Sequence, residues 1–211
     1  MSTTDRPMSQ MMKEGCADLH DKAEHAKVPS RMVAGEMTRE EFSAMLQQDA
    51  MWNKALDAAI LEHRDANPYL KALVEDIQLQ GPYYDEDLTH YGVPADVEPT
   101  PGVKAMLDTI EDARQNSPLT LLGLHYVREG ANNGNHYVAK KLRGAWGIEG
   151  DTGLRSLDPY GKNQRPLWEK FKITLDAQPF TAEEKDHMVQ SGRVMFERVM
   201  AIHEDLAGAT A

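Results

Sequence analysis

Apolar residues recur along this chain with the period of an α-helix, and no stretch alternates apolar and polar residues as a strand does. One helix is predicted to begin at Thr38, whose hydroxyl can form a capping box with Glu41. Its apolar stripe consists of Phe42, Met45, Leu46, Trp52, Leu56, Ala59 and Ile60. Thr181 and Glu184 repeat the capping box ahead of a stripe formed by Met188, Met195, Val199 and Leu206. The pattern predicts an all-α, multi-helix bundle.

Proline, glycine and capping residues divide the rest of the chain. The first helix is expected from about 11 to 27, because Pro29 disfavours a helical residue before it. Thr100 and Pro101 are typical of an N-cap followed by the first helical position. A further helix is predicted over 119–142, and 147–161 is predicted to be a loop. We expect residues 1–10 to be a disordered N-terminus and residues 11–208 to form a single helical domain.

Composition narrows the classes of function. The chain has 211 residues, enough for one sizeable core, with 41% hydrophobic and 27% charged residues, as in folded globular proteins. The net charge of −11 makes nucleic acid and anionic membrane surfaces poor partners. Cys16 is the only cysteine, and no apolar run approaches the ~20 residues of a membrane span or resembles a signal peptide. We therefore expect a cytoplasmic protein that does not span a membrane.

Glycine and asparagine are concentrated where a core helix would not normally place them, over residues 129–135. Each glycine in a helix interior costs about 0.5–1 kcal/mol relative to alanine. Gly130 and Gly134 are four residues apart and therefore share a helix face. One interpretation is a kinked helix whose bare backbone approaches a flat ligand. The alternatives are close packing against another helix, or a loop that separates two helices.

A second candidate is His20, which lies beside the apolar stripe of the first predicted helix. Glu24 is one turn further on and could fix the orientation of the imidazole, which is a suitable ligand for iron. The alternative is a histidine at the core boundary with no ligand. A carboxylate-bridged di-iron site needs two Glu-x-x-His pairs, and only the pair Glu184 and His187 is present.

These features occur in an order that resembles one known family. The quoted segments are Leu19-His20-Asp21-Lys22-Ala23-Glu24, Gly35 through Phe42, Tyr83 through Gly92, Thr100-Pro101, and Tyr126 through Gly134. Together they resemble the haem oxygenases, along nearly the whole chain from about residue 11 to 206. The resemblance implies an all-α fold that holds haem between a proximal and a distal helix.

The resemblance also assigns roles to particular residues. His20 would ligate the haem iron, and Glu24 and Tyr126 would belong to the cofactor-binding set. Gly130 and Gly134 would let the distal backbone crowd dioxygen and steer it toward a meso carbon. Haem would be both cofactor and substrate, and would be opened to biliverdin with release of CO and iron.

Basic residues would hold the haem propionates. Lys13, two turns before His20, corresponds to a propionate-binding lysine of the family, and Lys172 lies near a second such position, with Lys170 as an alternative. The resemblance further implies an external electron donor, such as ferredoxin or a flavin reductase.

One departure from the family concerns proton delivery. Many members have an aspartate after the first distal glycine, and Ala131 occupies that position here. Arg128, Asn133 or the neighbouring Asn132 and Asn135 could order water instead. Without such a network the chain would be a non-catalytic haem-binding or haem-storage protein of the same fold. A third hypothesis is a diverged helical bundle that acts on a different ligand.

Overall fold

The computed structural model describes residues 6–209, and its regular structure over that range is helical, without strands. The helices are α1 (Met8–Gly15), α2 (Ala17–Glu24), α3 (Lys27–Ala34), α4 (Arg39–Arg64), α5 (Pro68–Leu73), α6 (Gly81–Tyr91), α7 (Pro101–Asn116), α8 (Pro118–Trp146), α9 (Gln164–Asp176) and α10 (Ala182–Ala209). Two short 3₁₀ turns are η2 (Asp76–Gln78) and η3 (Gly161–Asn163). The predicted all-α class is confirmed.

The N-terminal segment differs from the single helix predicted over 11–27. It forms three short helices, which break at Cys16 and again at His25 and Ala26. Pro29 does not end a helix, because it lies in the first turn of α3, where its missing N–H costs no hydrogen bond. Residues 8–10 are the first turn of α1 rather than a disordered end, since Met8 is buried in the core. Residues 1–5 lie outside the described residues.

Capping explains where the long helices begin. The Thr38 hydroxyl accepts the Glu41 N–H at 3.1 Å, and the Glu41 carboxylate accepts the Thr38 N–H at 2.8 Å. Thr181 and Glu184 make the same pair of bonds before α10. Each box satisfies two N–H groups that the first helical turn leaves unpaired. All seven apolar positions predicted on α4 are buried.

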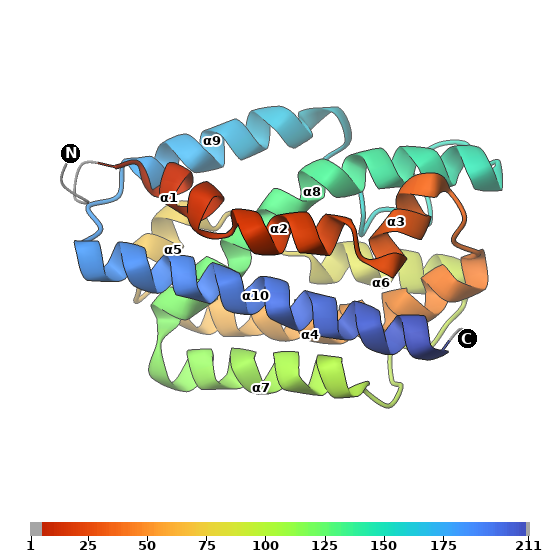
Figure 1. Cartoon of the computed structure of the whole chain (residues 1–211), viewed down its shortest axis with the longest axis horizontal. Coiled ribbons are helices and arrows are strands. Elements are labelled where there is room, and N and C mark those ends of the chain that lie inside the picture. Colours follow the sequence, from red (N-terminus) through yellow and green to blue (C-terminus); the bar gives the residue numbers. More distant parts are fainter. Residues whose placement is uncertain (1–5, 210–211) are drawn as a thin grey trace.

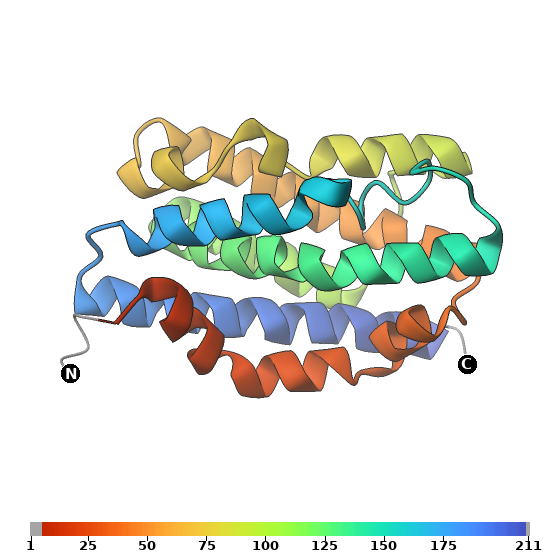
Figure 2. The ribbon, with the colours of Figure 1, turned by 90° about the horizontal axis from the view of Figure 1, so that it is seen from above.

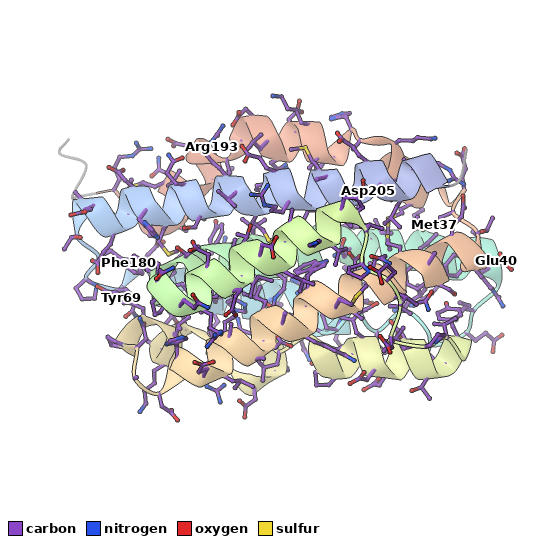
Figure 3. The ribbon with its side chains drawn as sticks, turned by 90° about the horizontal axis from the view of Figure 1, so that it is seen from below. Met37, Glu40, Tyr69, Phe180, Arg193 and Asp205 are labelled. Carbon is purple, nitrogen blue, oxygen red and sulfur yellow. The ribbon has the colours of Figure 1, made fainter. Side chains whose placement is uncertain are left out.

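Helix α8 runs through the centre of the bundle (Figure 1). It packs on α10 along one side and on α3, α4, α7 and α9 along others. Its axis changes direction near its middle, in both Figure 1 and Figure 2. Seen from below, α7 lies over α4 and α10 (Figure 3). The core is therefore built around α8.

Two glycines allow α10 to pack closely on its neighbours. A Cβ on Gly102 of α7 would lie 2.7 Å from the backbone nitrogen of Ile202, and a Cβ on Gly123 of α8 would overlap the Cβ of Ser191. Only glycine therefore fits at these positions. The contacts fix α10 against α7 and α8 and so set the frame of the bundle.

The segment 147–160 between α8 and η3 has no helix, as predicted. Within the described residues, no helix is both long and apolar enough to span a membrane.

Candidate functional site

One face of α8 is left open between two points of contact with the N-terminal helices. At one point, the side chains of Val127, Met12 and Cys16 converge over Gly192 of α10. At the other, the end of α3 packs against Lys141 and Ala145. These two points on α8 are about 20 Å apart along the helix axis. The intervening stretch contains both glycines of the predicted distal helix.

Gly134 faces open space in this interval. A Cβ built on Gly134 would meet no atom within 4 Å. One turn further along, Tyr137 is 70% exposed. The helix is continuous here, so the interpretation of this stretch as a loop is wrong. Helix packing does not account for Gly134 either, since no neighbouring helix fills the space in front of it.

Gly130 has a different environment. A Cβ on Gly130 would lie 3.4 Å from the Trp168 ring of α9. The Trp168 ring stacks on Phe171 with ring centroids 5.6 Å apart and lies 5.3 Å from the ring of Tyr126. This aromatic group closes the open interval at the Gly130 end. Tyr126 itself is nearly buried below Trp168, and its hydroxyl donates to the carbonyl of Ser9 at 3.4 Å.

His20 lies on α2, and both α2 and α8 pack on α10 from different sides (Figures 1 and 2). Its side chain is 58% exposed, and its Nδ1 is 3.7 Å from the nearer Glu24 oxygen. Its ring meets Phe196 of α10 edge to face, with centroids 5.8 Å apart. Glu24 therefore lies beside Nδ1 but beyond hydrogen-bond distance, and its role in orienting the ring stays a prediction. The Nε2 atom is left for another partner.

Arg193 of α10, labelled in Figure 3, holds α2 in place. Its guanidinium donates to both carboxylate oxygens of Asp18, at 2.6 and 3.0 Å, and to the carbonyl of Gly15. These hydrogen bonds lower the pKa of Asp18 to about 2. A bidentate pair fixes orientation as well as distance. The position of His20 relative to α10 follows from this contact.

The structure places Arg128 away from the open face. Its side chain is buried and lies 2.7 Å from Asp57 of α4. It also lies 3.1 Å from His125, and burial together with the charge of Arg128 holds the pKa of this histidine well below its ordinary value. Removing Arg128 would leave Asp57 as an uncompensated buried charge. The structure therefore gives Arg128 a role in a buried ion pair with Asp57, and its role in ordering water at the distal site stays a prediction.

The two asparagines that follow Ala131 differ in their hydrogen bonds. Asn133 donates to the Gly130 carbonyl at 3.0 Å and accepts from Gln164 at 3.4 Å. Asn132 is buried, and its side-chain nitrogen has no hydrogen-bond partner. Ala131 is exposed and brings no polar side-chain group to the site.

The three predicted lysines lie in different surroundings. Lys172 lies with its ammonium 5.8 Å from the Trp168 ring centroid, and it pairs with Glu169 at 2.9 Å. Lys170 pairs with Glu75 at 2.6 Å, and no contact joins its ammonium to the Trp168 ring. Lys13 is exposed at the end of α1. The structure thus favours Lys172 over Lys170 as the lysine beside the open interval.

Sequence reasoning missed two of the residues that shape the site. Trp168 of α9 lies beside Gly130, 38 residues earlier in the chain, and Phe196 of α10 contacts His20, 176 residues earlier. Both are aromatic residues beside a helical stripe, which is the only signal they give. Such residues belong to the core more often than to a site.

The di-iron alternative has no ligand set in the described part of the chain. No group of three or more His, Cys, Asp or Glu side chains is placed to hold a metal ion there. Glu184 is engaged by its capping box and by Tyr69, while His187 lies within hydrogen-bond distance of Ser117 and Thr120.

Comparisons with known proteins agree with this fold. The family model described as "Heme oxygenase" matches residues 6–205. Haem oxygenase 2 of Synechocystis sp. is 25% identical over 207 residues, covering 94% of this chain and 82% of the relative. A crystal structure of haem oxygenase-2 from Synechocystis, in complex with haem and NO, superimposes with a TM-score of 0.89 at 23% identity, covering 97% of this chain and 86% of that one. The haem oxygenase of Leptospira interrogans gives a TM-score of 0.86 at 18% identity, covering 94% and 98%.

The fold and the open face of its central helix define an all-α protein of the haem oxygenase type. Because the family model spans nearly the whole chain, the chain belongs to the haem oxygenase family.

Proposed function

We propose that this protein binds haem between α2 and α8 and oxidises it to biliverdin, releasing CO and iron. The observation that carries the proposal is the open face of α8 at Gly134, in a chain of this family whose α2 presents an exposed histidine. Bare helix backbone is what a flat ring needs for close approach, because no Cβ intervenes.

The residues present fit a haem. His20 offers Nε2 to the iron, and Glu24 at 3.7 Å from Nδ1 can tighten to a hydrogen bond that fixes the ring. Phe196 limits rotation of the imidazole from below. When bound, haem supplies the iron at which dioxygen reacts and is itself the molecule that is oxidised. The protein's part is to hold the ring and to keep one side of it against Gly134.

Cationic side chains would compensate the negative charge of the haem propionates. Two carboxylates that enter a partly apolar site need positive partners to offset their desolvation. Lys172 lies beside Trp168, which covers Gly130, and Lys13 lies on α1 at the same end of the open interval. We assign the two propionate contacts to these lysines and leave Lys170 to Glu75.

Ala131 favours a second candidate function, which is haem binding without efficient turnover. A side chain that cannot form hydrogen bonds stands where many family members have a proton-relaying aspartate, and Arg128 is turned away from the open face. Proton delivery in the catalytic case then relies on water ordered by Asn133 or by exposed backbone of α8. The two candidates differ in whether bound haem is consumed.

The electron donor remains a proposal from the family, and a ferredoxin or flavin reductase fits the role. A cytoplasmic location is proposed on the same footing, from the single cysteine and a reducing compartment.

The test is a haem titration of the wild type, His20→Ala and His25→Ala. His25 is the matched control, because it is also exposed and lies one turn from Asp21, whose carbonyl is 2.7 Å from its Nδ1. The wild type and His25→Ala should give a sharp Soret band with a histidine-ligated spectrum, and His20→Ala should lose that signature. An unchanged spectrum in His20→Ala would contradict the assignment of the ligand.

A further inference from the structure

The segment 151–161 contains no helical residue before the start of η3 at Gly161, yet most of its side chains are buried. Leu154, Ser156, Asp158 and Tyr160 are each at most 6% exposed. A connecting loop normally runs over the surface. A buried one is under a structural constraint, and its contacts show which elements it serves.

On one side the segment is fixed to α6. Asp87 is fully buried, and its two carboxylate oxygens accept the backbone N–H groups of Arg155 at 3.0 Å and Ser156 at 2.7 Å. Hydrogen bonds from backbone to an ionised carboxylate are among the stronger ones. They fix the position of the segment relative to α6, so that its other contacts can hold a neighbouring helix.

On the other side the segment contacts α8 at three points. The Tyr160 hydroxyl donates to Glu129 at 3.0 Å. Asp158 lies 2.8 Å from His136 and accepts from Arg143 at 2.9 Å. Burial opposes ionisation of Asp158, but the hydrogen bonds from these two residues hold its pKa below the ordinary value.

The three contact points on α8 are seven residues apart. Side chains at positions i, i+7 and i+14 lie on one face of a helix. At 100° per residue, this face is turned away from Gly134 by more than a right angle. The segment therefore supports the back of the same stretch whose front is open.

This stretch has the weakest intrinsic helix preference in α8. It contains Gly130, Asn132, Asn133, Gly134 and Asn135, and its front makes no packing contact at Gly134. Glycine costs about 1 kcal/mol and asparagine about 0.7 kcal/mol relative to alanine in a helix. Most helical stability in proteins comes from tertiary contacts, so contacts on the face opposite Gly134 must stabilise this stretch.

We propose that segment 151–161 is a brace that positions the distal helix: through Glu129, His136 and Arg143 it holds residues 129–143 of α8 in place while their front stays free for the haem ring. The residues of the brace are positioning residues, since none of them is placed on the open face. The part of this inference that concerns haem rests on the proposed function, whereas the part that concerns α8 does not.

The test compares amide hydrogen exchange in the haem-free wild type, Asp158→Asn and Asp205→Asn. Asp205 is the matched control, because it is a half-buried carboxylate that accepts the Gly102 N–H at 2.6 Å, far from the brace along the chain. In Asp158→Asn we expect amides of 129–143 to exchange roughly tenfold faster, with α4 and α7 unchanged. In Asp205→Asn the amides of 129–143 should keep their protection.

A second readout uses haem. The C–O stretching band of the ferrous CO complex reports crowding beside the ligand, and it should broaden or shift in Asp158→Asn but not in Asp205→Asn. His136→Ala removes one brace contact at a half-exposed site, and it replaces Asp158→Asn as the test variant if Asp158→Asn does not fold.

Unchanged exchange over 129–143, or equal acceleration in every helix, would overturn the brace. Absence of a Soret band in the wild type would overturn the proposed function instead, and the exchange data would still decide the brace.

Discussion

The two halves of α8 differ in how much of their surface is packed against the rest of the protein. In the first half, residues 121–129 are all buried, and Gly123 exists to let α10 approach. In the second half one face is open at Gly134, and the opposite face is held by hydrogen bonds to segment 151–161. Dense packing fixes the first half but leaves no room for a ligand. In the second half, packing of Val138, Ala139 and Leu142 and hydrogen bonds to segment 151–161 hold the helix from one side, and the face at Gly134 stays free.

The largest expected difference in the free energy of unfolding is between the variants Gly123→Val and Gly134→Ala. Valine at 123 would overlap Ser191 and the Met188 carbonyl, so we expect a loss of about 3 kcal/mol or complete failure to fold. Alanine at 134 has space and a better helix propensity, so it should stabilise the haem-free protein by about 0.5–1 kcal/mol. Urea unfolding measures both, and a destabilised Gly134→Ala would mean that this face is packed after all.

A second prediction concerns how the free energy of unfolding depends on pH. Burial raises the pKa of Glu129 to about 7, against the opposing effect of the Arg128 charge. Between the unfolded pKa near 4.5 and about 7 the folded state holds a proton that the unfolded state has lost, so stability falls as the pH rises through this range.

Glu129→Gln keeps an acceptor for Tyr160 and cannot ionise. It should therefore be more stable than the wild type at pH 8, by about 2–3 kcal/mol, and similar to it at pH 4. The control Glu183→Gln, at an exposed position on α10, should follow the wild type at both pH values. Equal stability of Glu129→Gln and wild type at pH 8 would show that ionisation of the buried Glu129 does not destabilise the folded protein.

The smallest expected effect separates Lys172 from Lys170. Charge reversal in Lys172→Glu should weaken haem binding by roughly tenfold, the equivalent of about 1.4 kcal/mol, because it removes a cation beside the open face. Lys170→Glu breaks only the ion pair with Glu75 and should bind haem as the wild type does. The measurement is the dissociation constant from Soret titrations. Reversed results for the two variants would move the propionate contact to Lys170.

Much of the fold could be predicted from the sequence, because helical periodicity and caps are local. The box at Thr38 and Glu41 and the buried stripe after it are where they were expected. The break at Cys16 follows Gly15, which is a poor helix former, but the break at His25 lies among alanine, glutamate and lysine, which all favour a helix. Tertiary contacts such as that between Arg193 and Asp18 decide how this segment bends around α10.

The site was predictable in part for the same reason. Poor helix formers at Gly130 and Gly134 are visible in the sequence, and so is the spacing of His20 and Glu24. The partners that come from other helices are not, and Trp168 is one of them. The burial of Arg128 against Asp57 also depends on the packing of α4, which residue spacing within α8 cannot reveal.

The central claim is that haem bound against the open half of α8 is oxidised there. It is tested most directly by supplying the haem complex with dioxygen and a reducing system and recording the visible spectrum over time, for the wild type and for Gly134→Leu. The Soret band of the wild type should decay as biliverdin absorption appears. Gly134→Leu should fold, because its side chain meets no atom within 4 Å at Cβ, but should degrade its haem far more slowly. A wild-type Soret band that persists without biliverdin, or full activity in Gly134→Leu, would contradict the account.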